Sequence, residues 1–182
     1  SPTAGTTTSS FTATVYNNTA PLDWAKSGAS LGAYNGQTIR VAFRNNSTNK
    51  YVMMIDNVST AVLPAKDGAI TSLYVPQILT SSSSQVAIDV KNNGAQNITS
   101  LKLSYKIDAN TPITQTFTGL NITPYGTQTL TFTTPISGLS QGSHSILVTL
   151  METNGAADPV TANNTANTNF TLPNGSTPRN GL

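Results

Sequence analysis

The sequence predicts an all-β protein in which an incomplete set of strands precedes a complete immunoglobulin-like sandwich, and three observations support this. Apolar residues alternate with polar ones along short segments and almost never recur at helical spacing. Turn-forming residues return at roughly ten-residue intervals through the second part of the chain, as in β-sandwiches. Charged residues make up only 9% of the chain, against about 25% in ordinary soluble domains, and Thr, Ser and Asn take their place.

The composition also excludes several classes of function. The chain has 182 residues and no cysteine, which excludes disulfides, thiolate metal sites and cysteine nucleophiles. His144 is the only histidine, so a multi-histidine metal site is excluded. The seven acids are sparse and Glu152 is the only glutamate, so we expect no catalytic residue. No apolar run is long enough to insert into a membrane, and nine scattered cations do not form the basic face that nucleic acid requires.

Residues 1–62 supply too few strands for a closed sheet. The segments 11–16 and 37–44 alternate, and residues 51–55 are continuously apolar, as in a strand that is covered on both faces. Trp24, the only tryptophan, lies in the irregular stretch between the first two segments. A sheet of about three strands leaves open edges and an apolar face, so we expect this segment to be part of a larger sheet.

Residues 63–68 are predicted to be a linker, and residues 69–173 hold the predicted sandwich of about seven strands. Without a disulfide, the packing of its inward apolar rows must stabilise this domain. Residues 174–182 contain no core residue and are predicted to be a spacer tail. The inward rows lie, in order, within residues 69–75, 86–90, 101–107, 113–118 (a shorter edge strand), 130–132, 146–150 and 169–172.

The first part of the chain resembles the C-terminal half of a known jelly roll. The resemblance runs from Trp24 through Leu31-Gly-Ala-Tyr34 and Gly36-Gln-Thr-Ile-Arg-Val-Ala-Phe-Arg44 to Ile55-Asp-Asn-Val58. The choice-of-anchor J family, also called cleaved adhesin or MAM-like, shows a Trp, then Leu-x-x-Tyr-x-Gly-x-x-Val-x-Ile-Ala-Phe-Arg, then a strand that ends in Ile-Asp-Asp-Val. The resemblance implies a partial jelly-roll sandwich over residues 1–62.

Residues 69–173 resemble a CARDB-type module, an immunoglobulin-like domain related to bacterial cell adhesion. The matching pieces are Val90-Lys-Asn-Asn-Gly94, Tyr125-Gly126 and Asn163-Asn-Thr165. Together the two resemblances imply a non-catalytic adhesive or structural module of a secreted, extracellular cell-surface protein, of the kind that type IX secretion exports. The chain begins with Ser1-Pro2 rather than an initiator Met, which predicts a processed piece of a longer product.

The jelly-roll resemblance also implies a metal ion and a partner. Members of that family often bind calcium, and their aspartate pair corresponds here to Asp56-Asn57, so Asp56 is the predicted metal ligand. The N-terminal strands of the family have no counterpart in residues 1–62. We therefore expect another polypeptide or subunit to supply the missing jelly-roll strands.

Two alternatives to this role stay open. A lone tryptophan in a loop can stack on a sugar ring, so Trp24 is the predicted ligand-binding residue of a carbohydrate-binding accessory module in a larger exported enzyme. A surface glycan or protein would then be the partner. Incomplete sheets also suit a filament subunit that assembles by strand donation. By contrast, we predict structural roles for Asp158, which lies in a loop with Asn163 and Asn164 and is typical of an Asx turn. We predict the same for His144, which lies at the start of a strand.

Overall fold

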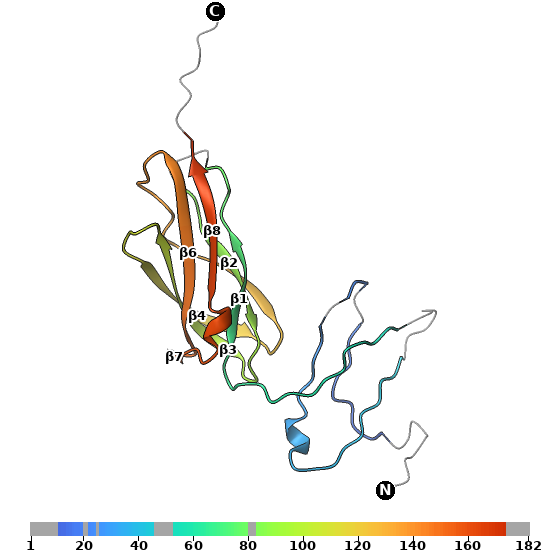
Figure 1. The fold of residues 1–182 in the computed structure, drawn as a ribbon. Helices are drawn as coiled ribbons and strands as arrows, with labels where there is room; N and C mark the ends of the chain where they lie inside the picture. The colour runs from blue at the N-terminus through green and yellow to red at the C-terminus, as the bar shows by residue number, and fades with distance from the viewer. Residues whose placement is uncertain (1–10, 20–21, 25, 46–52, 80–82, 174–182) are drawn as a thin grey trace, which may run out of the picture. The chain divides into compact units, whose positions relative to one another are not determined.

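The computed structural model describes residues 11–19, 22–24, 26–45, 53–79 and 83–173. The chain divides into two units, Ser1–Ala61 and Val62–Leu182, and each is described by itself. All strands of the described residues lie in the second unit, which confirms the predicted all-β class (Figure 1). Two short 3₁₀ turns complete the described elements, η2 (Gly32–Tyr34) and η3 (Thr161–Asn163). The predicted spacer tail lies outside the described residues.

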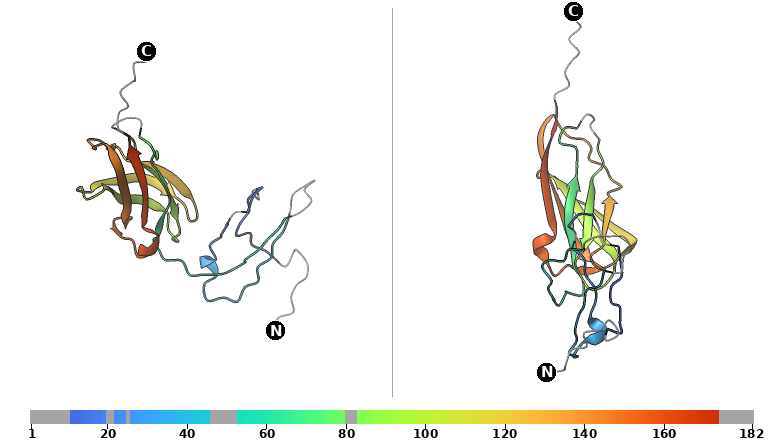
Figure 2. Two further views of the ribbon diagram at one scale, coloured as in Figure 1. Left: turned by 45° about the horizontal axis from the view of Figure 1, so that its top comes forward. Right: turned by 90° about the vertical axis from the view of Figure 1, so that its right-hand side faces the viewer.

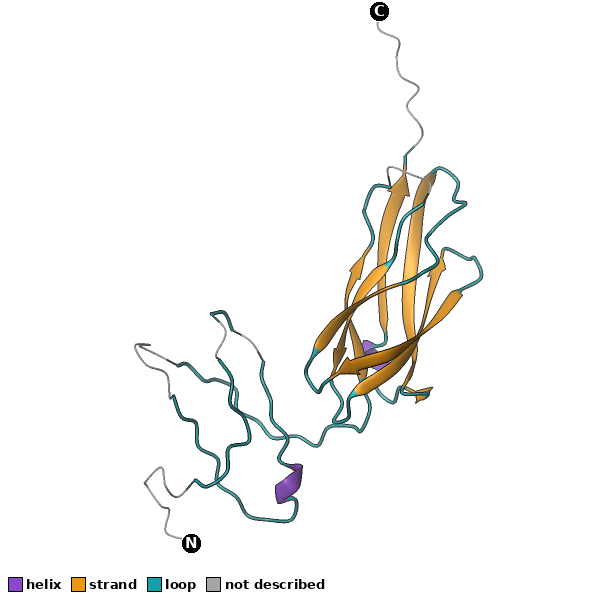
Figure 3. Cartoon of the chain, turned by 180° about the vertical axis from the view of Figure 1, so that it is seen from behind, coloured by secondary structure: helices purple, strands orange, loops and turns teal. Residues whose placement is uncertain are grey.

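Two antiparallel sheets face each other in the second unit (Figures 1 and 3). The first has the order β1 (Gly68–Tyr74), β2 (Ala87–Asn92), β5 (Thr127–Thr131). The second has the order β4 (Ile113–Ile122), β3 (Ile98–Ile107), β6 (Gly142–Thr153), with β8 (Thr165–Leu172) and the two-residue β7 (Ala156–Ala157) also paired to β6. The fold is therefore the predicted immunoglobulin-like sandwich, with β7 added to its strands.

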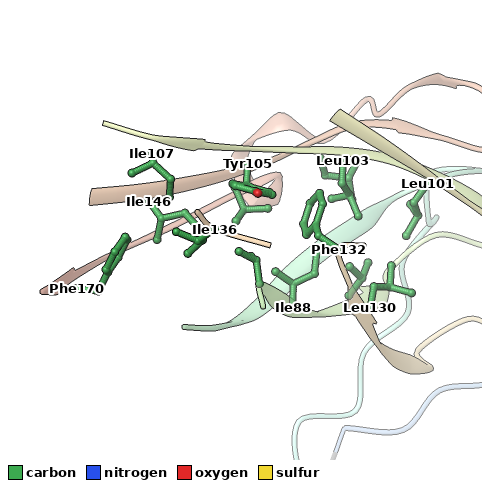
Figure 4. Packing of buried hydrophobic residues seen from close by; sticks show 14 of the residues in the cluster. Ile88, Leu101, Leu103, Tyr105, Ile107, Leu130, Phe132, Ile136, Ile146 and Phe170 are labelled. Atoms are coloured by element: carbon green, nitrogen blue, oxygen red, sulfur yellow. The ribbon is translucent and has the colours of Figure 1, made fainter. Parts of the chain in front are cut away.

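The core lies between the two sheets and contains side chains from the predicted inward rows, together with Leu79, Ile98, Ile122 and Ile136, which lie outside them. On β2, Ile88 and Val90 are fully buried, while Asp89 lies on the outer face, because successive side chains of a strand point to opposite sides. Phe132 lies between the two layers, with its ring edge-to-face against Tyr105 at a centroid distance of 5.0 Å (Figure 4). The same ring contacts Phe117 at 5.6 Å. These aromatic contacts join β3, β4 and the segment after β5.

The strands β4 and β8 both extend beyond the ranges that the sequence predicts for them. β4 continues to Ile122, because a bulge opposite Ile98 and Ser100 lets its ladder with β3 resume, and Gly119 adopts a positive φ of 70° there. β8 begins at Thr165, although its outward residues are polar, because it pairs with β6 over its full length (Figure 2). Polar alternation carries little hydrophobic signal, so only the tertiary pairing reveals these extensions.

The first unit contains no strand among its described residues (Figure 3). The strands predicted at residues 11–16 and 37–44 are therefore not formed in this chain by itself, and the same holds for residues 53–55. Residues 51–52 of the third predicted strand lie outside the described residues. Alternation shows which residues suit a strand, but a strand needs a neighbour that accepts and donates its backbone hydrogen bonds.

Candidate functional site

A cluster of buried polar side chains lies at the start of β1. Asp158 is only 5% exposed, and its Oδ2 accepts hydrogen bonds from the Gly68 backbone N–H at 2.8 Å and from Thr153 Oγ1 at 2.7 Å. Its Oδ1 accepts the Val160 N–H at 3.0 Å, which is an Asx turn. One carboxylate therefore joins β1, the end of β6 and the loop before β8. This confirms the structural role that the sequence predicts for Asp158.

Asp67 extends the cluster from the other side. Asn163 Nδ2 donates to Asp67 Oδ1 at 2.9 Å, and the Asn93 N–H donates to the Asp67 carbonyl at 2.8 Å. Burial raises the pKa of Asp67 above its ordinary value, the Asn163 hydrogen bond opposes this rise, and the nearby charge of Asp158 adds to it. The Asn164 amide nitrogen can donate to the Gly68 carbonyl at 3.1 Å. We call Asp67, Thr153, Asp158, Asn163 and Asn164 the carboxylate brace.

The brace has the oxygen donors that a hard cation prefers, but protein groups already occupy them. Asp158 accepts three hydrogen bonds, and no buried side-chain polar atom among the described residues lacks a partner. A calcium ion takes six to eight oxygens, typically from several carboxylates. No group of three or more His, Cys, Asp or Glu in the described part of the chain could hold a metal ion. The chemistry of the brace is therefore that of a structural junction.

Asn92, within the Val90–Gly94 motif, forms a second junction. Its side chain is fully buried, and Nδ2 donates to the carbonyls of Gln96 and Ile122, both at 2.8 Å. Its backbone N–H donates to the Gly126 carbonyl at 2.9 Å, and the Tyr125 N–H donates to the Asn92 carbonyl at 2.8 Å. Two motif pieces thus meet in space, Val90–Gly94 with Tyr125–Gly126. The Asn-Asn-Gly sequence signals the turn, but its long-range partners are not visible in the sequence.

The single histidine is also structural. His144 Nδ1 lies 2.7 Å from Asp108 Oδ2, and Nε2 lies 2.9 Å from the Ser140 carbonyl oxygen. Ser145 Oγ bonds Asp108 Oδ1 at 3.2 Å rather than the imidazole. A serine–histidine–aspartate triad needs the imidazole between the acid and the serine hydroxyl. Here both ring nitrogens face oxygen acceptors, so His144 has no nitrogen with which to act as a general base.

The two predicted site residues, Asp56 and Trp24, lie in the first unit. Asp56 is exposed, and its Oδ1 accepts the Asn57 N–H at 2.7 Å. Trp24 is 71% exposed, as a sugar-stacking side chain requires. Calcium at Asp56 and a ligand at Trp24 both stay predictions.

The described surface offers one further kind of candidate, the apolar side chains of the first unit. Exposed apolar side chains mark an interaction surface where they form a contiguous patch. No helix among the described residues is long and apolar enough to cross a membrane. The exposed side chains of this unit are Phe11, Val15, Tyr16, Leu22, Trp24, Ile39, Val41, Phe43, Met53, Met54, Ile55 and Val58.

Comparison with known proteins places a family over the second unit. Residues 67–168, more than half of the chain, match a family model described as CARDB. The chain is similar to the crystal structure of a CARDB domain from Pyrococcus furiosus in complex with di-metal ions, at 20% identity and a TM-score of 0.45, over 66% of this chain and 99% of that one. The chain is also similar to a solution NMR structure of the same domain, at 20% identity and a TM-score of 0.47, over 61% of this chain and 98% of that one. No curated protein matches the sequence.

Proposed function

The chain belongs to the CARDB family, and we propose that it is a non-catalytic adhesive or structural module of a secreted or cell-surface bacterial protein. CARDB domains are immunoglobulin-like domains of bacterial surface proteins. The hydrogen bonds within the carboxylate brace and around His144 support a non-catalytic role, because protein groups occupy the Asp158 oxygen Oδ2 and both ring nitrogens of His144. The resemblance of residues 1–62 to a jelly roll supports an adhesive setting.

The observation that carries this proposal is the contrast between the two units. The second unit closes a core around side chains such as Phe132, which is 0% exposed. The first unit has segments that alternate as strands do, but no strand among its described residues, and Val41 and Phe43 are 53% and 57% exposed. In our proposal, strands from another polypeptide or subunit complete the first unit, and the sandwich displays it.

Strand addition would supply the missing strand pairing of the first unit and cover its exposed apolar side chains. Ile39, Val41 and Phe43 lie at alternate positions, so in a strand they share one face. A partner strand would supply ladder hydrogen bonds, and a facing layer would cover the apolar row at roughly 25 cal/mol per Å². The backbone pairing gives affinity, and the alternate side chains give register.

The test is the solution mass of the chain purified from the cells that make it, by light scattering with intact mass spectrometry on the same peak. We expect a second polypeptide or a multiple of 19.0 kDa. Val41→Lys should release the 19.0 kDa monomer, because it places a charge in the apolar row. Met151→Lys, at a 43% exposed position on β6, is the matched control and should keep the assembly. A wild-type monomer would contradict completion by another chain.

The exposure of Trp24 supports a second candidate, a carbohydrate-binding accessory module. A glycan array probed with the wild-type chain and with Trp24→Ala tests it. Tyr16→Ala, at a 50% exposed aromatic position of the same unit, is the control. Binding that only Trp24→Ala abolishes would favour the accessory role, and ordered fibres by electron microscopy would favour a filament subunit instead.

Calcium at Asp56 is the remaining part of the proposal. Asp56 is an exposed carboxylate whose Oδ1 accepts a local backbone hydrogen bond, and in this proposal the completing strands supply further oxygen ligands. Calorimetric titration of the completed assembly with calcium should give binding that Asp56→Asn weakens and that Asp23→Asn leaves unchanged. Equal binding by both variants would remove Asp56 from the site.

A further inference from the structure

His144 holds three segments together at one end of the sandwich. The residue lies near the start of β6, and its side chain is only 8% exposed. One ring nitrogen faces Asp108 in the turn after β3, at 2.7 Å, and the other faces the Ser140 carbonyl in the loop before β6, at 2.9 Å. The imidazole also packs on the Phe170 ring of β8, with a centroid distance of 5.5 Å.

The two acceptors determine which form of the ring fits. A neutral imidazole has one N–H and one lone pair, so either tautomer would direct a lone pair at an oxygen less than 3 Å away. Only the imidazolium can donate to both oxygens. Asp108 is fixed as the counter-ion, because its Oδ1 accepts the Ser145 N–H at 2.8 Å and its own N–H donates to the Ser145 carbonyl at 3.0 Å.

We propose that His144 is a proton-dependent latch, whose imidazolium closes this end of the sandwich at neutral pH and whose deprotonation at higher pH releases both the loop at Ser140 and the turn at Asp108. This inference concerns the second unit and does not depend on the completion of the first. Among the groups that face the ring, Asp108 supplies the one charge, Ser140 a carbonyl and Phe170 an apolar surface.

The direction of the pH dependence follows from the surroundings of the ring. The hydrogen bond to Asp108 and that to the Ser140 carbonyl raise the pKa of His144 above its ordinary value of 6.5, while burial lowers it less strongly. A group whose pKa is raised by folding stabilises the folded state below its unfolded pKa. That contribution is lost as the pH rises through the folded pKa. The latch is therefore closed below the unfolded pKa of the imidazole and opens as the pH rises through its folded pKa.

The first test uses the fact that the chain has one histidine. Long-range ¹⁵N–¹H NMR of the full chain reports the protonation of both ring nitrogens from a single residue. We expect two protonated nitrogens at pH 7 and a titration midpoint above that of the urea-unfolded chain. Asp108→Asn should move the midpoint toward the unfolded value, and Asp89→Asn, on the other sheet, should not. A single neutral tautomer at pH 7 would overturn the proposal.

The second test asks whether deprotonation opens this end. Hydrogen exchange of the Ser145 amide, which donates to Asp108, should lose protection across the His144 titration. The Asn154 amide, which donates to the Ser100 carbonyl beyond the far end of β6, is the control and should keep its protection. Equal protection of Ser145 below and above the midpoint would overturn the latch, even if the ring proves to be doubly protonated. The protonation state at pH 7 and the exchange of the Ser145 amide are both read from the wild-type chain, so these two results do not depend on how well a variant folds.

Discussion

Asp158 holds Gly68 across ninety positions of the sequence, with its Oδ2 2.8 Å from the Gly68 backbone nitrogen. Glycine at this end of β1 allows a close approach, because a Cβ at position 68 would lie 2.9 Å from Leu150 Cδ1 and 3.1 Å from Thr153 Oγ1. The close approach lets the carboxylate bond the first residue of the sandwich and Thr153 at once. The start of β1 is thus fixed by the loop that precedes β8.

Replacing Asp158 by Asn should therefore destabilise the second unit. An amide nitrogen would face either the Gly68 N–H or the Val160 N–H, both of which are donors. We expect the free energy of unfolding to fall by about 1–3 kcal/mol, the cost of leaving a buried group without its partner. Urea denaturation measures this, with Asp23→Asn at an exposed position of the first unit as the control. Equal midpoints for the two variants would contradict a stabilising role for the brace.

Gly94→Ala should destabilise the same junction through the backbone. A Cβ at position 94 would lie 2.7 Å from the Asp67 nitrogen and 3.0 Å from the Lys66 carbonyl carbon, and neither backbone atom can move away easily. Overpacking of this kind costs about 1–3 kcal/mol. Thermal unfolding compares it with Gly32→Ala, whose Cβ would meet its nearest neighbour, Ser30 Oγ, at an ordinary 3.4 Å. We expect a lower midpoint for the first variant alone.

The sequence predicts the core of the second unit well, because its strands alternate strictly. At residues 86–90 and 101–107, every second side chain is apolar, and these are the side chains that the structure buries. Side chains alternate between the two faces of a strand, so the alternation of apolar and polar residues shows which face is buried. The predicted structural roles of His144 and Asp158 are also confirmed, since His144 lies in the buried row of β6 and Asp158 forms an Asx turn with Val160.

The junctions could not be predicted, because their partners are far apart in the sequence. Asp67 occurs in a Lys-Asp-Gly context that is typical of a turn, and its partner Asn163 lies 96 positions away. Asp108 and His144 are separated by 36 positions. Only the register between β3 and β6, which pairs Ile107 with Ile146, brings them together. Local alternation gives the face of each strand but not the register between strands.

Asp67 and Asp89 should give opposite pH dependences. Burial raises the pKa of Asp67 above 3.8, so its contribution to stability is lost as the pH rises through the folded value. Hydrogen bonds from Thr129 and then Tyr74 lower the pKa of Asp89, so its contribution is present above 3.8 and lost as the pH falls through the folded value. Relative to wild type, Asp67→Asn should therefore gain stability between acid and neutral pH, while Asp89→Asn should lose it.

Urea unfolding of the wild type and both variants at a series of pH values from 2 to 7 measures how the free energy of unfolding depends on pH in each. Asp89 is on the outer face of β2, so solvent screening makes its effect the smaller of the two. Parallel curves for the two variants would show that the burial of Asp67 does not penalise its charge. Such a result would require water or a cation beside the carboxylate.

Phe132 should be the most costly core position to truncate. Its side chain is 0% exposed and its ring makes edge contacts with both Tyr105 and Phe117. Phe132→Ala removes these contacts and leaves a cavity between the sheets, which costs about 3–5 kcal/mol. Tyr105→Phe removes only the hydroxyl that donates to the Thr134 carbonyl at 3.1 Å and should cost about 1 kcal/mol.

The matched control for this truncation is Phe11→Ala in the first unit. Phe11 is 42% exposed, so its loss should change the unfolding of the sandwich by less than about 0.5 kcal/mol. Calorimetry of the three variants separates the units, because only the core variants should shift the main transition. If Phe11→Ala lowered that transition as far as Phe132→Ala does, the sandwich would depend on the first unit for its stability. That result would contradict the proposal that the sandwich folds by itself and displays the first unit.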